Sequence, residues 1–371
     1  MEKRNTQFKP GAVWPDDNGT HINAHGGGIL CYEDVFYWFG EHKIAGEAGN
    51  VAHVGVHCYS STDLYNWKDE GISLPVSDDP TSEITAGCIL ERPKVIYNAT
   101  TCRFVMWFHL ELKGQSYNSA RVGVAVADRP TGPYAFLHSF RPNAGRWPIN
   151  VTAEERHAIY NAQLMAEMRR FHGGGPDPNA ARFPFWIRDF ADGQMSRDMT
   201  LFQDDDGTAY HICASEENGT LHISQLSDDY LCTTGKYTRV FNKRWHEAPA
   251  VCKYDGRHWM ITSDCTGWAP NPARSAVAAS IWGPWRELGN PTEGINLDNG
   301  IGPEKTFGGQ STYILAVPGK PNAFIAMFDL WHPENAIDGR YLWLPMRFQD
   351  DKPLITWRSE WDLSVFDDRE E

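Results

Sequence analysis

The sequence predicts an all-β protein, a five-bladed β-propeller, from three observations. A hairpin pattern occurs five times: a short apolar run, a polar or glycine-bearing turn, and a run of β-branched and aromatic residues. The hairpins begin at residues 29, 95, 201, 251 and 313, with gaps of 66, 106, 50 and 62 residues. Third strands and outer turns recur after several hairpins, at 54–59, 122–126 and 276–279 and at 63–67, 131–134 and 282–285. Four-stranded blades with their loops give such spacings, and a decorated β-sandwich is the alternative fold.

In chain order the predicted hairpins span residues 29–39, 95–108, 201–212, 251–261 and 313–327. The turn Asp204-Asp-Asp-Gly207 lacks the spacing of a calcium-binding loop, so we interpret it as the turn of the third hairpin. We expect one domain over residues 1–371, with the acidic end 367–371 as a solvated tail.

The gap of 106 residues contains a helix-bearing insertion, at about 140–195, between the second and third blades. Thr152-Ala-Glu-Glu155 is a capping box, and we predict a helix over 154–170 that Gly173–Pro178 ends. Its packing residues are Ile159, Leu164, Met165 and Met168. The insertion leads into Ser196-Arg-Asp198. Two interpretations stay open: it lines the mouth of the site, or it decorates the surface.

Composition narrows the class of partner. A net charge of −14 argues against nucleic acid and anionic membranes, and no run of about 18 apolar residues is present. The eight cysteines (31, 58, 88, 102, 213, 232, 252 and 265) form no CxxC pair, and we predict mostly buried thiols. The first residues contain no apolar stretch, so we expect a cytoplasmic protein, or a secreted or periplasmic one if a leader has been removed.

Five polar residues stand just before the five hairpins: His25, Glu91, Asp198, Glu247 and Gln310. The first strand of each propeller blade faces the central channel, so equivalent positions on the inner strands converge near the axis. Ionisable groups are costly to bury there unless they are paired or used. We therefore expect one active-site pocket. His21 and His25 are four residues apart but not on a predicted helix, so we do not expect them to form a metal pair.

Glycoside hydrolysis fits this set of side chains. It needs an acid that protonates the leaving oxygen and a group that activates water on the far side of the sugar. Glu247 fits the acid, and Asp198 fits a carboxylate that raises its pKa, with Trp245 and Trp268 as apolar neighbours. Asp198 could instead cap a turn or pair with Arg197, and Glu91 could form an inert ion pair with Arg92 or Lys94.

Several longer motifs resemble glycoside hydrolase family 43, a family of inverting five-bladed propellers. They are 22–28, 38–41, 91–98, 196–207, 247–250 and 309–312, and the resemblance covers about residues 14–365. They are most similar to the branch that contains exo-β-1,3-galactanases, which release galactose from galactan ends. No cofactor is expected to be required, and the sequence carries no signal for an ion in the channel or for an oligomeric state.

The resemblance implies that Glu247 is the general acid and that Asp198 modulates its pKa. The usual base, an Asp on the first inner strand, is absent, since that stretch is Asn23-Ala-His25. In the galactanase branch a Gln matching Gln310 is thought to act as base through its imidic tautomer, and Glu91 is the charged rival or a sugar contact. The resemblance also makes Glu41 a sugar contact. The other predicted substrate contacts are His25, Arg197, Thr266, Trp268 and Trp331.

Three functions follow for an oligo- or polysaccharide partner. The first is an inverting, exo-acting β-galactosidase on β-1,3-galactan or related glycans. The second is a β-galactofuranosidase or α-L-arabinofuranosidase on the same scaffold. The third is a carbohydrate-binding propeller without catalysis, which the absent base favours.

Overall fold

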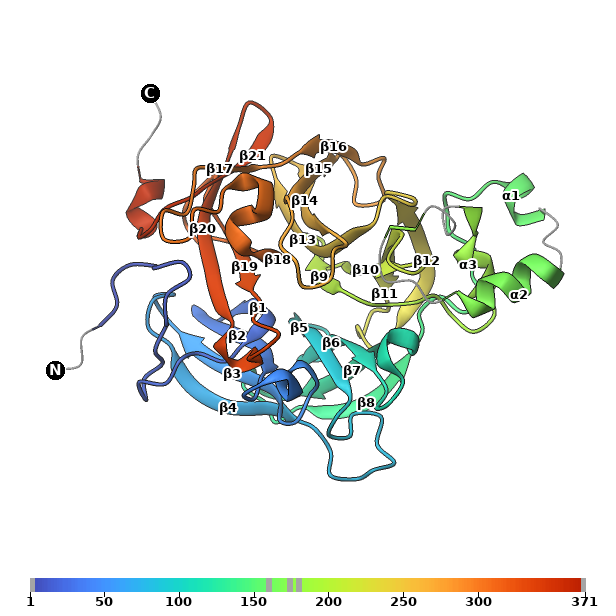
Figure 1. Cartoon of the computed structure of the whole chain (residues 1–371), viewed down its shortest axis with the longest axis horizontal. Coiled ribbons are helices and arrows are strands. Elements are labelled where there is room, and N and C mark those ends of the chain that lie inside the picture. The colour runs from blue at the N-terminus through green and yellow to red at the C-terminus, as the bar shows by residue number, and fades with distance from the viewer. Residues whose placement is uncertain (1–3, 158–161, 172–175, 178–181, 368–371) are drawn as a thin grey trace.

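A computed structural model describes residues 4–157, 162–171, 176–177 and 182–367. It shows five β-sheets arranged around an axis, as the ribbons in Figure 1 show. The five-bladed propeller is therefore confirmed. The inner strands of neighbouring blades contact one another around the whole ring: β1 with β5, β5 with β9, β9 with β13, β13 with β18, and β18 with β1.

Each blade is built from one continuous stretch of chain. The strands of the first two blades are β1 (His25–Tyr32), β2 (Val35–His42), β3 (Gly55–Ser61), β4 (Lys68–Pro75), β5 (Ile89–Asn98), β6 (Arg103–Glu111), β7 (Arg121–Ala127) and β8 (Ala135–Phe140). Those of the third and fourth are β9 (Met199–Gln203), β10 (Ala209–Ser215), β11 (Thr220–Leu226), β12 (Thr233–Val240), β13 (His246–Tyr254), β14 (Arg257–Asp264), β15 (Arg274–Ala278) and β16 (Arg286–Gly289).

The fifth blade contains β18 (Gln310–Ala316), β19 (Phe324–Leu330), β20 (Arg340–Gln349) and β21 (Lys352–Thr356). The short strand β17 (Thr292–Glu293) adds to it by pairing parallel to β21. All the other ladders within the five sheets are antiparallel, and apart from β17 the consecutive strands of each blade are neighbours in its sheet.

Hydrophobic clusters fill the spaces between neighbouring blades. One joins the first and fifth blades through Trp38, Tyr59, Ile325 and Trp343, and four others join the remaining pairs. The side chains that alternate along each strand face these clusters, so every blade buries both of its faces. This packing fixes the five inner strands relative to one another, and so it fixes the side chains at their ends.

The predicted strand starts are too late. The inner strands begin at His25 instead of Ile29, at Ile89 instead of Val95, and at His246 instead of Val251. His25, Glu91, Glu247 and Gln310 therefore lie within the inner strands and not before them. Asp198 does precede its strand, by one residue.

The insertion leaves the ring after β8 and returns at β9, as predicted. It contains α1 (Ala153–His157), α2 (Ala162–Arg170) and α3 (Phe185–Arg188). The capping box is confirmed: the backbone N–H of Thr152 donates to Glu155, and that of Glu155 donates to the Thr152 hydroxyl, at 2.8 and 3.2 Å. The predicted helix is two helices on either side of residues 158–161, and both Ile159 and most of the Gly173–Pro178 stop signal lie outside the described residues.

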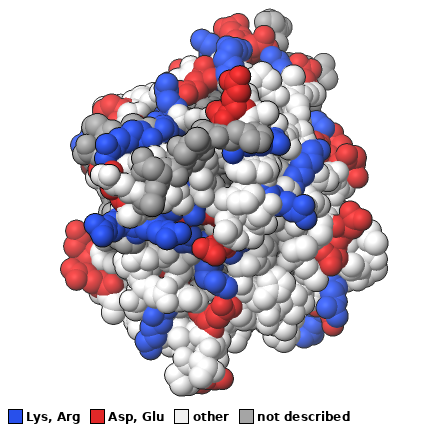
Figure 2. Space-filling model, turned by 90° about the vertical axis from the view of Figure 1, so that its right-hand side faces the viewer, with Lys and Arg blue, Asp and Glu red and all other residues white. Residues whose placement is uncertain are grey.

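Met168 is buried against Phe183 and Phe185, with Leu164 and Met165 beside them, so the packing face of α2 is as predicted. The insertion lies along the outer strand of the third blade, because Ile149 and Asn150 hydrogen-bond to the backbone of β12. Figure 1 shows its helices at the right-hand edge, away from the axis, and Figure 2 shows Lys and Arg side chains gathered on this side of the molecule.

Candidate active site

A cavity of about 590 Å³ opens at the end of the propeller where the inner strands begin. All five blades contribute side chains to its wall, including Glu41, Glu91, Asp198, Glu247 and Gln310. The described residues of the insertion, from 141 to 195, are not among those that line it. The structure therefore favours the second interpretation of the insertion, an element at the outer edge of the third blade.

Bulges occur at equivalent places on three inner strands, and Glu91 and Glu247 beside two of them line the cavity. The pairing register shifts between His25 and Gly28, between Glu91 and Lys94, and between Glu247 and Ala250. The first residue of each bulge has a positive φ: 61° at Gly26, 55° at Arg92 and 49° at Ala248. A bulge bends its strand and redirects a side chain. The same device thus turns the ends of three inner strands toward the axis.

Glu247 has the environment of a carboxylic acid that keeps its proton. Its Oε1 atom accepts hydrogen bonds from Asn218 Nδ2 at 2.8 Å and from the Cys265 thiol at 3.1 Å. Burial, followed by the charge of Asp198, raises the pKa of Glu247 to about 8. Because Oε1 already receives two donors, the second oxygen, Oε2, is the one that can carry and release a proton.

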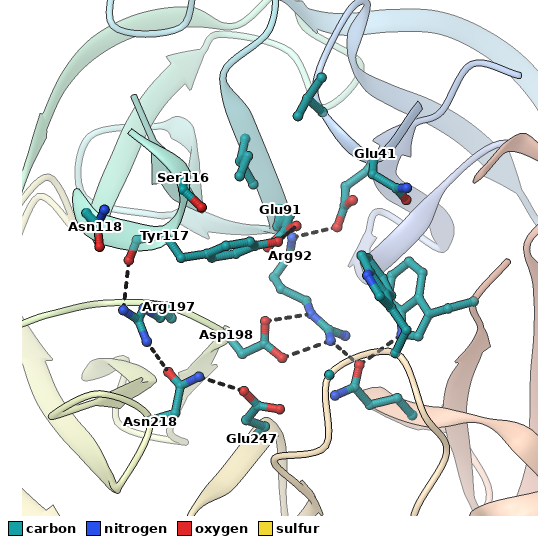
Figure 3. Close-up of a pocket in the computed structure, with 17 residues that line it drawn as sticks. Glu41, Glu91, Arg92, Ser116, Tyr117, Asn118, Arg197, Asp198, Asn218 and Glu247 are labelled. Carbon is teal, nitrogen blue, oxygen red and sulfur yellow. Dashed lines mark hydrogen bonds and ion pairs between the residues drawn. The ribbon is translucent and has the colours of Figure 1, made fainter. Parts of the chain in front are cut away.

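Asp198 is held by Arg92. The guanidinium donates to both carboxylate oxygens, from Nε at 3.2 Å and from Nη2 at 2.9 Å. This bidentate contact fixes the orientation of the carboxylate. Figure 3 shows Asp198 between Arg92 and Glu247, so its charge acts on Glu247 at short range while its own oxygens are satisfied. Two alternatives had been considered for Asp198, a turn cap and an ion pair with Arg197. The structure pairs its carboxylate with Arg92 instead.

Gln310 is oriented by two strong donors. Its Oε1 atom accepts from Arg92 Nη2 at 2.6 Å and from Trp331 Nε1 at 2.8 Å, while its Nε2 donates to the Ser263 hydroxyl at 3.1 Å. Arg and Trp can only donate, so the oxygen must face them. The nitrogen is then the atom left to face water. Two donors at the oxygen hold the side chain as the amide, because an imidic hydroxyl would find no acceptor in either of them.

Glu91 is ionised. Its Oε1 atom accepts from the Tyr117 hydroxyl at 2.8 Å, and its Oε2 atom lies 3.1 Å from His109 Nδ1. Burial by itself would raise the pKa of this carboxyl, but the hydrogen bond and charge of His109 outweigh it and lower the pKa to about 2. So low a pKa makes Glu91 a weak base for water and a good acceptor for hydroxyl groups.

Among the described residues, one group of three has ligand atoms within 4.8 Å of one another: Glu91, His109 and Asp198. Hydrogen bonds already engage these atoms. Both ring nitrogens of His109 face carboxylates, and Arg92 covers both oxygens of Asp198. This donor set does not suit a metal, which needs a ring nitrogen with a free lone pair.

Comparison with known proteins identifies the family. Residues 182–296 match the family model described as glycosyl hydrolases family 43. A β-1,3-galactosidase of that family, determined with galactodeoxynojirimycin, is 52% identical, with a TM-score of 0.88 over 96% of this chain and 100% of that one. This chain belongs to glycoside hydrolase family 43. It is therefore a glycosidase, with a carbohydrate as its substrate.

Two further family 43 structures are similar over most of this chain. An exo-β-1,3-galactanase from Phanerochaete chrysosporium, determined with galactose, is 31% identical, with a TM-score of 0.74 over 97% of this chain and 69% of that one. An exo-β-1,3-galactanase from Clostridium thermocellum is 30% identical, with a TM-score of 0.75 over 95% and 66%. A search of curated proteins returns no match.

Two tryptophans form one wall of the family 43 cavity. The rings of Trp268 and Trp331 are 5.6 Å apart and edge to face, and Trp268 is 43% exposed. The Arg92 guanidinium lies 5.2 Å from the Trp331 ring. Both tryptophans were predicted as substrate contacts and both line the cavity. Flat aromatic faces suit sugar rings.

Glu41 and Arg197 also line the cavity, as predicted. Glu41 Oε1 accepts the backbone N–H of Arg92 at 3.0 Å, and Oε2 lies 2.6 Å from Lys43 Nζ. Arg197 donates to the backbone oxygen of Tyr117 at 2.7 Å and to Glu217 at 3.0 Å. These contacts link the second blade to the third.

Three predicted residues do not reach the cavity. His25 is 0% exposed, with its ring 6.4 Å from Trp331, so the prediction of a sugar contact is wrong: the bulge at Gly26 leaves it under the wall. Thr266 hydrogen-bonds within its own loop, to Ala269 and Asn271, and does not line the cavity. Trp245, predicted as an apolar neighbour of Glu247, does not line the cavity, whereas Trp268 does.

Sequence reasoning missed several members of the site. Arg92 was considered only as an ion-pair partner of Glu91, yet it contacts Asp198, Gln310 and the backbone of Ser311. Asn218 and Cys265, which hold Glu247, and Tyr117, which holds Glu91, lie on loops between strands. The recurring position before each hairpin could not identify them. One signal was available: Glu91-Arg92-Pro93 and Glu247-Ala248-Pro249 share the same spacing of Glu and Pro.

In the described residues no helix is both long and apolar enough to cross a membrane. All eight cysteines are free thiols; five of them are buried, and Cys31, Cys102 and Cys232 are exposed.

Proposed function

We propose that this enzyme is an exo-acting β-1,3-galactosidase that releases terminal galactose with inversion. The observation that carries the proposal is the likeness to a β-1,3-galactosidase over the full length of both chains, at 52% identity. The exo mode is supported by the two similar exo-β-1,3-galactanases.

Glu247 is the proposed general acid. Its raised pKa keeps it protonated at neutral pH, and Oε2 gives the proton to the oxygen that leaves the anomeric carbon. Asp198, the proposed modulator, stays fixed by Arg92. Its charge disfavours a second negative charge at Glu247, so Glu247 keeps its proton until the leaving oxygen takes it.

Gln310 is the proposed group that positions the attacking water. As an amide it takes no proton; its N–H orients the water toward the anomeric carbon, and the proton that the water loses is released to solvent after the attack. The structure argues against Glu91 in this role, since the imidazole of His109 lowers its basicity. Glu91 and Glu41 are instead the proposed acceptors for sugar hydroxyls, and Trp268 and Trp331 the apolar wall.

The test is a substrate panel followed by NMR. β-1,3-Galactobiose and aryl β-galactopyranoside should be hydrolysed, and aryl galactofuranoside and arabinofuranoside should not. The first galactose released should be the α-anomer, because a single displacement inverts the β configuration. Hydrolysis of the furanosides alone would support the second predicted function. No turnover, with galactose still bound, would support a binding propeller.

A further inference from the structure

Glu91, His109 and Glu111 form a buried row of ionisable groups. The proposed reaction uses neither His109 nor Glu111. The Nδ1 atom of His109 is 3.1 Å from Glu91 Oε2, and its Nε2 atom is 2.9 Å from Glu111 Oε1. His109 and Glu111 are both 0% exposed. A neutral imidazole has only one N–H, so a ring that faces two carboxylates at hydrogen-bond distance must share an additional proton with them.

The remaining contacts decide where that proton lies. Glu111 Oε2 accepts the backbone N–H of Ala120 at 2.7 Å, and Glu91 Oε1 accepts the Tyr117 hydroxyl at 2.8 Å. Donors at the outer oxygens stabilise the ionised form of both carboxyls. The proton therefore belongs to the ring, which is an imidazolium between two anions.

Other charges surround these groups. Lys43 favours the anion of Glu91 and Arg141 interacts with Glu111, whereas Glu41 and Asp198, which has an oxygen within 4.8 Å of Glu91, oppose the Glu91 anion. Burial lowers the pKa of His109, but the two carboxylates outweigh it and raise the pKa to about 10.

We propose that His109 and Glu111 are positioning residues of the sugar subsite. Glu111 keeps His109 charged, and the charged ring keeps Glu91 an anion of fixed orientation, whose remaining lone pairs accept hydrogen bonds from hydroxyl groups of the terminal sugar. In this arrangement Glu91 binds hydroxyl groups of the sugar, and Gln310 contacts the attacking water. This inference rests on the proposed function, since it takes galactose as the ligand.

The charge of His109 can be measured without any ligand. In protein labelled with ¹⁵N-histidine, His109 is assigned by the signal that His109→Gln removes. Its ring should keep imidazolium shifts in the wild type from about pH 5 to about pH 9. In Glu111→Gln the ring should lose its proton at a lower pH, because one counter-charge is gone. A wild-type His109 that titrates near its ordinary pKa would overturn the proposal.

The effect on recognition is measured as galactose affinity by calorimetry from about pH 4 to about pH 8. Removing the imidazolium should raise the pKa of the buried Glu91. Affinity of His109→Gln should fall about tenfold or more from the upper end of this range to the lower end, while the wild type shows no such pH-dependent loss. Glu91→Gln is the matched control and should bind weakly at every pH.

An identical pH dependence in His109→Gln and the wild type would overturn the positioning role. If the wild type does not bind galactose at all, the proposed substrate is wrong, and the NMR titration still decides the charge of the row. Failure of the inference and failure of the proposed function are therefore distinguishable.

Discussion

Glu91 and Glu247 line the same cavity, yet their surroundings displace their pKa values in opposite directions, to about 2 and about 8. Glu91 faces an imidazolium, whereas Glu247 faces a carboxylate and receives only the amide of Asn218 and a thiol. Two identical side chains thereby acquire different tasks, one accepting hydrogen bonds and one donating a proton.

Asp198→Asn should move the alkaline limb of the pH–rate profile to lower pH. A raised acid pKa means that activity is present below about pH 8 and is lost as pH rises through it. Removing the negative charge of Asp198, while the Arg92 guanidinium remains nearby, should lower the pKa of Glu247. kcat/KM measured against pH on an unactivated disaccharide checks this. An unchanged limb would show that Asp198 does not modulate Glu247.

Gln310→Ala should lower kcat by about 10²-fold or more if the amide handles the water. Gln310→Glu is the informative partner, because a carboxylate keeps an oxygen for Arg92 and Trp331 and supplies a true base. We expect it to retain activity and to gain an acidic limb in its pH profile. A kcat of Gln310→Ala near that of the wild type would show that another group acts on the attacking water.

At the scale of the element, the bulges explain why the predicted starts of the inner strands were too late. Pro93 and Pro249 cannot donate to a ladder, and within strands proline occurs mainly at bulges and edges. The second and fourth hairpins were predicted to begin at Val95 and Val251, after these prolines. The structure pairs Glu91 and Glu247 across the bulges, with His109 and Ser263.

Gly26→Ala should damage the site through its neighbours. A Cβ atom there would lie 2.3 Å from Glu41 Oε1 and 3.4 Å from Arg92 Cδ, and φ at this residue is +61°. We expect a loss of kcat/KM of about tenfold or more, together with about 1 kcal/mol or more of stability.

Gly256→Ala is the matched control for this change. Its φ is +68°, but a Cβ atom would meet nothing within 4 Å, so it should lose similar stability and keep full activity. Thermal unfolding and kinetics on both variants separate the two effects. Equal activity of the two variants would contradict the account of the bulge.

At the scale of the whole molecule, the ring has to close between the last blade and the first. Each sheet is continuous in sequence, so closure depends on packing and on the N-terminal segment. The backbone of Phe8 exchanges hydrogen bonds with that of Trp361, at 2.7 and 3.1 Å. The Phe8 ring lies 4.4 Å from Trp361 and 4.6 Å from Tyr65.

Phe8→Ala should lower the free energy of unfolding by about 3–5 kcal/mol, because Phe8 is 1% exposed and its removal leaves a cavity in the closing cluster. Denaturant unfolding checks this. Leu297→Ala, at a side chain 82% exposed, should change stability by less than about 0.5 kcal/mol. Equal stabilities of the two variants would show that closure does not depend on this cluster.

The five hairpins and the convergence of their inner ends were predictable, because alternating apolar strands with tight turns leave a local signal. The loop residues that hold the acid were not. Asn218 reaches Glu247 only once the third and fourth blades are side by side, and Cys265 follows β14 in a loop that carries no repeated pattern. The place of the insertion was not predictable either, because its contacts with β12 involve backbone groups that carry no sequence signal.

The central claim is that five inner strands bring together one cavity in which Glu247 gives a proton to the departing sugar. Glu247→Gln tests it most directly, with β-1,3-galactobiose and an aryl β-galactoside that has an acidic leaving group. The variant should fold normally, lose about 10²–10⁴-fold in kcat on the disaccharide, and lose far less on the aryl substrate, whose leaving group needs no proton. Undiminished hydrolysis of the disaccharide by this variant would contradict the account.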